Sequence, residues 1–504
     1  MSQIRKQSII STVVVYGGLI IGFMNTYLFT RQGSFFTPVE YGLTVLFISV
    51  GNLMFAFASM GMISVVYKFY PYYDDNLPKK KNDLLTWTLL ISFIGFLFVI
   101  LAGYVFKDLV VRKFGGNSPL FLPYYRWIFP FGFSILLFNI LEVFAWQIRK
   151  SVFTTFLKEV MFKLLTLTLI FLVSYNFIRD FDGFIKFYSL TYGVTALILL
   201  AFLIRKDAFN ITFTISKVTK RFYKKMLSMA TLTYLGSVVF MIAQFIGTLI
   251  IASLLGMAEV GIYFLGASFA GIVQAPQRGA IAAATPVLAK AWKDKDIAKI
   301  QMIYQRSGIN LLIASLGIFL LLWLNFEDIV ITFKLQPDFL NSVWIFFFLG
   351  LARVVDLGSG VNSQIIVTST FWRFEFFSGV ILLTLILPLN YFLIKEFGII
   401  GAGYSDFISL TIYNVIRIVF LKRKFNIHPF TNKTVTAVII AFVCYGICYY
   451  TFQNFHGFLG IVLKGSVFTV LYGGAIVYFN LSPDVLPVFE TIKKRAGLGS
   501  KQEF

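Results

Sequence analysis

Two arginines lie deep within apolar stretches of the sequence, where a charged side chain is costly. Arg278 follows Pro276 in GIVQAPQRGAIAAA (271–284), and Arg353 lies in LARVVDLGSGVNSQIIVTS (351–369). An arginine at the centre of a membrane helix costs about 2.5–3.5 kcal/mol, so it usually faces a water-filled cavity. Because guanidinium groups pair with phosphate and diphosphate oxygens, both arginines are predicted to bind an anionic substrate. An alternative stays open for Arg278, which reaches lipid phosphates if it lies near the cytoplasmic end of its helix.

Two carboxylates lie in stretches of the same kind. Asp356 follows Arg353 by three residues, which places both side chains on one helical face, and Glu142 lies in an earlier apolar stretch. Acids inside membrane helices often bind coupling ions. We therefore expect Asp356 and Glu142 to take up a coupling proton or sodium ion. The alternative is that Arg353 and Asp356 form an internal ion pair with only a structural role.

Amide side chains in apolar stretches complete the predicted site. An amide at this depth either contacts substrate or forms a hydrogen bond between helices, and both roles stay open here. The candidates for substrate binding are Asn25, Asn52, Gln274 and Asn362.

Motifs of soluble enzymes do not occur in the sequence. There is no P-loop, GxSxG or HExxH, and the adjacent acids Asp74 and Asp75 lie on a short basic segment typical of solvated charge. The cysteines, Cys444 and Cys448, and the two histidines do not have the spacing of a metal site. We expect neither an enzyme nor a bound metal, and no cofactor other than a coupling ion.

The composition is that of a membrane protein. Of the 504 residues, 58% are hydrophobic and 13% are charged, whereas about a quarter of a soluble domain is charged. The basic start and the long apolar run after it predict a retained first span rather than a signal peptide. Fourteen stretches are long enough to cross about 30 Å of hydrocarbon, which predicts an all-α polytopic membrane protein. They lie near residues 8–29, 40–67, 84–106, 127–147, 159–177, 183–204, 227–254, 258–285, 307–326, 339–365, 374–394, 398–421, 433–453 and 458–480.

The basic residues are distributed unevenly between the connecting segments. With the N-terminus placed inside, the inner segments carry 30 of the 44 lysines and arginines, the outer segments carry 8, and 6 lie within spans. Cytoplasmic segments of membrane proteins are enriched in these residues, so both termini are predicted to be cytoplasmic. The net charge of +21 is explained in this way and does not indicate nucleic acid.

The first six spans recur as spans seven to twelve. VEYGLTVLFISVGN (39–52) resembles AEVGIYFLGASFAG (258–271), WIFPF (127–131) resembles WIFFF (344–348), and FYSLT resembles FISLT further along, at offsets of 219, 217 and 220 residues. An even number of spans gives parallel repeats, which commonly enclose a cleft suited to alternating access. The predicted organisation is therefore a six-helix bundle at 1–206, a second at 207–430, and two extra helices with a cytoplasmic tail at 431–504.

This arrangement resembles the multidrug/oligosaccharidyl-lipid/polysaccharide exporter superfamily. The resemblance rests on the opening RKQSIISTVVVYGGLIIGFMNTYLFTRQGSFFTPVEYGLTVLF and, in the second half, on VGIYFLGASFAGIVQAPQRGAIAAATPVLAK and GSGVNSQIIVTSTFWRFEF. Within the superfamily the chain looks like the polysaccharide-biosynthesis flippases. The resemblance implies a bacterial cytoplasmic-membrane protein that flips an undecaprenyl-diphosphate-linked oligosaccharide to the outer leaflet, with cavity arginines meeting the diphosphate. It differs from lipid II flippases, because its first span has only Asn25 and the terminal Arg31 where those proteins have a charged Arg–Asp cluster.

Two other functions remain open from the sequence. A cation-coupled multidrug exporter would have the same fold but an acid-lined cavity, which the arginines disfavour. A membrane enzyme of the O-antigen polymerase type would need a long catalytic loop, and the longest connection here is roughly 205–226. The partners expected are the lipid-linked oligosaccharide and membrane lipids, and the sequence predicts no oligomeric state.

Overall fold

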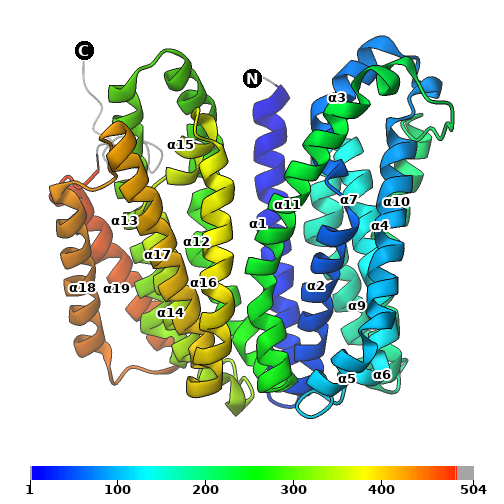
Figure 1. Cartoon of the computed structure of the whole chain (residues 1–504). Helices are drawn as coiled ribbons and strands as arrows, with labels where there is room; N and C mark the ends of the chain where they lie inside the picture. Colours follow the sequence, from blue (N-terminus) through cyan, green and yellow to red (C-terminus); the bar gives the residue numbers. More distant parts are fainter. Residues whose placement is uncertain (1–2, 483, 485–504) are drawn as a thin grey trace, which may run out of the picture. The chain divides into compact units, whose positions relative to one another are not determined.

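The computed structural model describes residues 3–482 and residue 484, and these residues form two compact units, 1–261 and 262–504. Within each unit the long helices run nearly parallel to one another (Figure 1). Thirteen helices in the described part of the chain are long and apolar enough to cross a membrane. The prediction of an all-α polytopic membrane protein is confirmed. The cytoplasmic tail predicted at the C-terminus lies largely outside the described residues.

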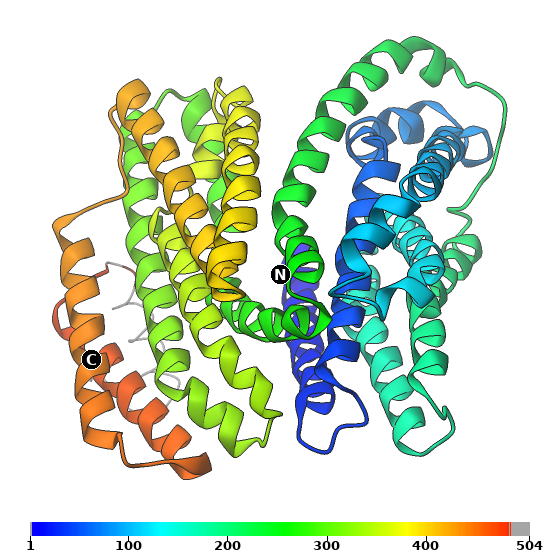
Figure 2. The ribbon, with the colours of Figure 1, turned by 60° about the horizontal axis from the view of Figure 1, so that its bottom comes forward.

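Unit 1 holds the helices of the first predicted bundle together with the long helix that follows it. Its main elements are α1 (Gln3–Thr30), α2 (Pro38–Ala58), α3 (Met62–Asn76), α4 (Leu84–Val105), α5 (Lys107–Phe114), α6 (Phe121–Tyr124), α7 (Ile128–Gln147), α8 (Ser151–Phe156), η3 (Leu157–Met161), α9 (Phe162–Ser174), α10 (Phe181–Arg205) and α11 (Lys217–Leu254). Figure 2 shows α11 as a curved helix, and it packs against α2 and α3. By contacts α11 therefore lies with unit 1, whereas the sequence repeat makes it the first helix of the second bundle.

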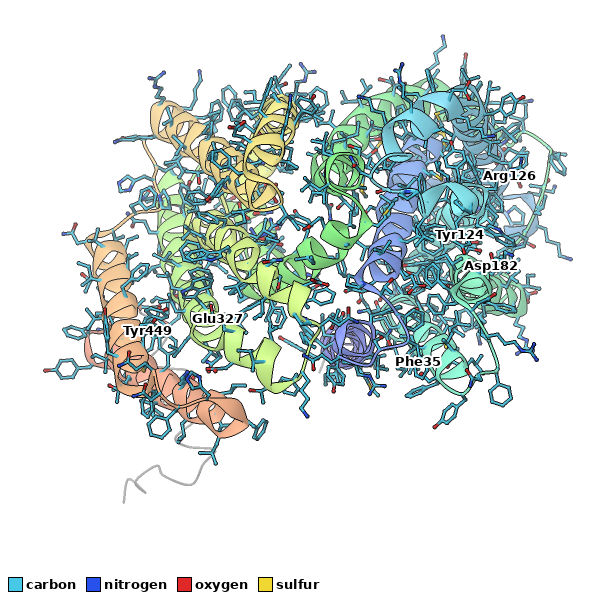
Figure 3. The ribbon with its side chains drawn as sticks, turned by 90° about the horizontal axis from the view of Figure 1, so that it is seen from below. Phe35, Tyr124, Arg126, Asp182, Glu327 and Tyr449 are labelled. Atoms are coloured by element: carbon cyan, nitrogen blue, oxygen red, sulfur yellow. The ribbon has the colours of Figure 1, made fainter. Side chains whose placement is uncertain are left out.

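The links between helices meet at two opposite ends of unit 1. We call the end at which α1 begins the basic end, because the links 77–83, 148–150 and 206–216 lie there and carry lysines (Figure 1). Figure 3 views the opposite end, where Tyr124 and Asp182 lie close together and Arg126 lies nearby. The loop 107–126, which carries more basic residues than expected for an outer segment, belongs to this opposite end.

The second predicted span is divided into two helices. α2 begins with a capping box in which Thr37 and Glu40 satisfy each other's backbone amides. It ends at Ala58, and α3 starts after Gly61, whose φ of +72° is left-handed. A Cβ on Gly61 would lie 2.1 Å from the carbonyl oxygen of Ala230 in α11. Only glycine permits this backbone conformation at so close an approach.

The fifth predicted span contains a π-helical turn. α8, the π turn η3 and α9 follow one another without a break from Ser151 to Ser174. This segment is not one of the thirteen apolar helices, and it contains the charged residues Lys158, Glu159 and Lys163. A Cβ on Gly18 of α1 would lie 2.3 Å from the carbonyl oxygen of Glu159, so α1 touches the π turn. Single π turns in helices are frequent at functional sites.

Unit 2 contains the remaining helices. They are most of α12 (Met257–Lys293), α13 (Ile297–Thr332), α14 (Ser342–Gly358), α15 (Asn362–Thr368), α16 (Arg373–Phe397), α17 (Ile400–Phe425), α18 (Asn432–Phe452) and α19 (Gly457–Tyr478). The tenth predicted span is interrupted at Ser359–Val361, between α14 and α15. Gly360 there has a φ of +69° and lies against Tyr304 and Ser307 of α13. The interruption exposes polar backbone and side-chain groups inside the unit.

The two extra helices are attached to α13 at both of its ends. Near one end the Lys464 ammonium lies 2.6 Å from the Asp328 carboxylate, and both side chains are buried. The ring of His456 lies 2.9 Å from the other oxygen of Asp328. Towards the other end Arg306 pairs with Asp484. In Figure 3 the labels Glu327 and Tyr449 mark α13 and α18 in this unit.

Candidate functional site

A buried arginine, Arg417 of α17, lies at one end of a hydrogen-bonded cluster in unit 2. Its guanidinium donates to the Glu375 carboxylate of α16 and to the Tyr413 hydroxyl, and its Nη1 lies 3.5 Å from the Asn362 amide oxygen. The guanidinium carbon also lies 3.8 Å from the centre of the Tyr413 ring. Ser363 donates to the same carboxylate oxygen of Glu375 at 2.8 Å. A planar cation with several fixed partners of this kind is strongly oriented.

The cluster continues through amide and hydroxyl groups toward the break between α14 and α15. The side-chain oxygen of Asn414 accepts hydrogen bonds from Asn362 and from Ser359, each at 2.8 Å. The side-chain nitrogen of Asn414 donates to Asp356 at 3.0 Å. The predicted site residue Asn362 thus lies buried between Arg417 and Asn414.

The far end of the cluster is on α12. Gln277 donates to the second carboxylate oxygen of Asp356 at 3.0 Å, and Gln274 donates to Gln277 at 3.0 Å. We call the whole chain of contacts from Gln274 to Arg417 the unit 2 cluster. It brings together three predicted residues, Gln274, Asp356 and Asn362, on three different helices.

Asp356 is held by neutral donors alone. Its two carboxylate oxygens accept hydrogen bonds from the side-chain amides of Asn414 and Gln277. It forms no salt bridge with any residue that the structure describes. Arg353, one turn earlier on α14, interacts instead with the Asp406 carboxylate of α17. The internal Arg353–Asp356 pair that the sequence left open is therefore absent, because the two side chains point to different neighbours.

Arg278 has a different setting from the rest of the predicted site. It is exposed, next to Gln277 on α12, and it makes no hydrogen bond or ion pair with any residue that the structure describes. It lies 21 residues beyond Met257, where α12 begins, or about 32 Å at 1.5 Å per residue. This distance is close to the thickness of the hydrocarbon core, about 30 Å.

Unit 1 contains a second cluster of charges. The buried carboxylate of Glu142 in α7 accepts a hydrogen bond from Lys158 of η3 at 3.1 Å. The next residue, Glu159, pairs with Lys163 one turn further on, at 3.2 Å. Asn25 of α1 donates to the carbonyl oxygen of Lys163 at 2.9 Å. We call these residues the unit 1 cluster.

Two further features define this cluster. The side-chain oxygen of Asn25 is buried and has no hydrogen-bond partner among the described residues. The Lys163 side chain lies along α1 beside Gly22, where a Cβ would be 3.6 Å from the ammonium nitrogen. The last predicted residue, Asn52, donates to the Ile48 carbonyl of its own helix at 2.7 Å and makes no other side-chain hydrogen bond with a described residue. It lies outside both clusters.

Sequence reasoning missed the cations of both clusters. Arg417 was within the predicted span 398–421, and its spacing of four from Tyr413 was the available signal, because residues at i and i+4 share a helical face. Lys158 lies just before the predicted span 159–177, and Lys163 lies inside it. In both cases the decisive information is the tertiary partner, which local sequence does not contain.

The two clusters occupy related positions in the repeat with opposite charge. At the offset of 217 residues, Lys158 corresponds to Glu375 and Asn139 corresponds to Asp356. Lys158 pairs with an acid of α7, whereas Glu375 pairs with Arg417 of α17. Each unit therefore has an ion pair at this repeat position, but the residue there is basic in unit 1 and acidic in unit 2.

Comparisons with known proteins identify this architecture. The MatE family profile matches residues 232–350. A structure of the lipid II flippase MurJ in an inward closed conformation superposes with a TM-score of 0.70, at 16% identity, over 93% of this chain and 100% of that one. The chain has the fold of the multidrug/oligosaccharidyl-lipid/polysaccharide exporter superfamily. The fold that the sequence resemblance implied is thereby confirmed.

Structures of two further transporters are similar in the same way. An inward-facing multidrug resistance MATE transporter has a TM-score of 0.65 at 15% identity, over 83% of this chain and 98% of that one. A superfamily transporter from Pyrococcus furiosus, described as having a binding pocket of reverse polarity, has a TM-score of 0.58 at 14% identity, over 84% and 96%. No curated protein matches the chain. These similarities show a shared fold, and the substrates and activities named for those proteins are theirs.

Proposed function

We propose that the protein flips an undecaprenyl-diphosphate-linked oligosaccharide across the bacterial cytoplasmic membrane by alternating access. The observation that carries the proposal is the exposed guanidinium of Arg278, which has no anionic partner among the described residues and lies on a membrane-spanning helix. An unpaired cation near the membrane boundary favours an anionic ligand, and diphosphate oxygens match the guanidinium fork. Arg353, Asn25 and Asn52 remain further candidates for contacts with the substrate.

The unit 2 cluster supports a role for Asp356 in coupling transport to an ion. Asp356 accepts only from the neutral amides of Gln277 and Asn414, so its charge is available to a proton or a sodium ion. Glu142, the other candidate, already has Lys158 at 3.1 Å. Because a cation paired with a carboxylate disfavours uptake of a second cation, Asp356 is the stronger candidate.

We place both termini in the cytoplasm, because 30 of the 44 basic residues then lie in inner segments. In this orientation α12 crosses from the outer to the inner face, and Arg278 lies near the inner boundary. The substrate's diphosphate begins its passage at this boundary, so Arg278 is suited to its capture. This role joins the two interpretations that the sequence left open, since the same position also reaches lipid phosphates.

The test is a leaflet assay on the full chain reconstituted in vesicles. We expect the lipid-linked oligosaccharide to reach the opposite leaflet faster than in empty vesicles, and Arg278→Ala to lower the rate at least tenfold, the loss expected for one charge-assisted contact of about 1.5–3 kcal/mol. Arg373→Ala is the matched control, because Arg373 is also exposed and begins α16 in the same unit. Equal rates with protein and with empty vesicles would overturn the proposal. Normal transport by Arg278→Ala would remove that residue from the site.

A cation-coupled multidrug exporter is the competing function. The MATE transporters of the same fold support it, and Asp356 would then serve as an ion site for a drug exporter. The same vesicles distinguish the two functions: a multidrug exporter moves an organic cation and leaves the lipid-linked oligosaccharide in place. The membrane-enzyme alternative has no supporting feature in the described residues.

A further inference from the structure

A polar cavity of about 210 Å³ opens at the basic end of unit 1. Three separate links line it, and each contributes one lysine: Lys79 between α3 and α4, Lys150 between α7 and α8, and Lys206 between α10 and α11. We call it the lysine cavity. None of the three lysines makes an ion pair or a hydrogen bond through its side chain with a described residue. Three converging ammonium groups without a carboxylate in contact favour an anionic ligand.

The remaining polar lining suits hydroxyl groups beside that anion. Asn82, Asn210 and the phenol of Tyr70 offer donors and acceptors, and the carboxylates of Asp74 and Asp207 accept hydrogen bonds from hydroxyls. The carboxylates repel a phosphate at their own positions and so confine it to the lysines. The chemistry of the lining therefore matches a phosphate group that carries a small polyhydroxyl substituent.

A buried aspartate fixes the walls of the lysine cavity. Asp83 is fully buried, and its Oδ2 accepts hydrogen bonds from the Ser216 amide at 2.9 Å, the Thr219 hydroxyl at 2.7 Å and the Trp87 indole at 3.1 Å. These contacts tie the link before α4 to the link before α11. The cavity is therefore a built feature of the basic end rather than a gap between loose loops.

A separate apolar crevice of about 230 Å³ lies in the groove between α4 and α7, about one turn along both helices from the lysine cavity. Leu85 of α4 lines the cavity, and Leu89 and Phe93, one and two turns further along the same face, line the crevice. On α7, Phe144 lines the cavity and Ile140 the crevice. The remaining crevice residues are Leu90, Phe133, Leu136 and Leu137.

We propose that this groove of unit 1 binds one anionic phospholipid, with the phosphate in the lysine cavity and an acyl chain in the apolar crevice. The lysines of the cavity match the phosphate of such a lipid, and the apolar lining of the crevice matches an acyl chain. Both features lie along α4 and α7, as the two parts of one lipid molecule require. The basic end is the predicted cytoplasmic end, where anionic head groups face lysines. A soluble phosphate compound would leave the crevice unused. This site is separate from both clusters and does not depend on the proposed function.

Native mass spectrometry of the purified full chain tests the proposal, with phosphatidylglycerol and phosphatidylcholine as probes. A lysine beside an anionic lipid contributes about fivefold to binding, so the triple variant K79Q/K150Q/K206Q should bind phosphatidylglycerol about a hundredfold more weakly. The variant K220Q/K224Q/K225Q removes the same charge from α11 and should bind as the unchanged protein does. Leu89→Trp fills the crevice and should also weaken binding, whereas Leu101→Trp, on the exposed end of α4, should not.

Three outcomes would overturn the proposal. Equal binding of phosphatidylglycerol and phosphatidylcholine would exclude a head-group site. Equal losses in the two triple-lysine variants would show a general attraction of the basic end. Displacement of the lipid by inorganic diphosphate, together with no effect of Leu89→Trp, would identify a soluble phosphate ligand instead. All variants are exposed or line open cavities, and retention of a monodisperse elution profile confirms that each has folded.

Discussion

In Lys464→Met the Asp328 carboxylate loses the ammonium group that lies 2.6 Å from it in the buried contact between α13 and α19. The carboxylate keeps its contact with the ring of His456 at 2.9 Å. In the converse variant, Asp328→Leu, the buried ammonium of Lys464 keeps no anionic partner. We therefore expect Asp328→Leu to be the more damaging of the two single changes.

The burial of both partners sets the size of the effect. Their side chains are 7% and 9% exposed, and removal of one partner from such a pair costs about 3–5 kcal/mol. We expect about 3 kcal/mol for Lys464→Met and about 5 kcal/mol for Asp328→Leu. The double variant replaces the pair with apolar groups of similar size, which is often neutral. It should therefore be more stable than either single variant.

Thermal unfolding of the detergent-purified chain, followed by size-exclusion chromatography, measures this cycle. A loss of about 3 kcal/mol lowers Tm by about 6–12 °C in a unit of this size. Lys186→Met is the matched control, because it removes a lysine from an exposed i,i+4 pair with Asp182, worth about 0–1 kcal/mol. A double variant as unstable as Asp328→Leu would refute the reasoning, since the cost would then come from packing rather than from a stranded charge.

Two further predictions concern the contacts of α1 and of α13. Gly18→Ala should destabilise unit 1 by about 1–3 kcal/mol, because the added Cβ would overlap the carbonyl oxygen of Glu159. Gly17→Ala is the control: a Cβ there has no neighbour within 4 Å, so Tm should stay the same or rise. Equal Tm values for the two variants would contradict the close contact at Gly18. The hydrogen bond from Arg306 holds the pKa of the Asp484 carboxyl below its usual range, so the pair stabilises the protein at neutral pH and this contribution is lost as pH falls below about 4. The Tm difference between the unchanged protein and Arg306→Gln should therefore be full at pH 7 and shrink steadily as pH is lowered below about 4. A difference that does not shrink at all on acidification would exclude ionisation of Asp484 as its origin.

Hydropathy and charge were sufficient to predict the membrane spans, because both report on the surrounding solvent rather than on contacts between helices. A helix that crosses lipid needs an apolar surface over the thickness of the hydrocarbon, and a run of apolar residues of that length is recognisable in the sequence. The break at Ser59–Gly61 was not visible in the same way. The apolar run continues through it, and its cause is the close approach of α11, which lies about 170 residues away in the chain.

The sequence could predict some of the residues of the candidate site, but not the contacts between them. Polar residues in apolar runs identified Gln274, Asp356 and Asn362, which the structure does bring together. The sequence did not indicate that Asp356 would bond to amides rather than to Arg353, since the choice depends on how α14 is rotated against α17. It also gave no reason to place Arg417 in the cluster. A single basic residue near the end of a span is equally typical of an interfacial position.

The neutral donors around Asp356 have an electrical consequence. In the unit 2 cluster the charges of Glu375 and Arg417 cancel, so one negative charge remains, whereas the four charges of the unit 1 cluster sum to zero. Asp356 lies 14 residues into α14, about 21 Å from its start, or roughly two thirds of the way across the hydrocarbon. An elementary charge crossing the whole membrane gains about 2.3 kcal/mol per 100 mV. The membrane voltage would therefore act on a cation bound at Asp356 as we propose, with about 1.5 kcal/mol per 100 mV measured from the start of α14. The unit 1 cluster, whose charges sum to zero, would not respond to it.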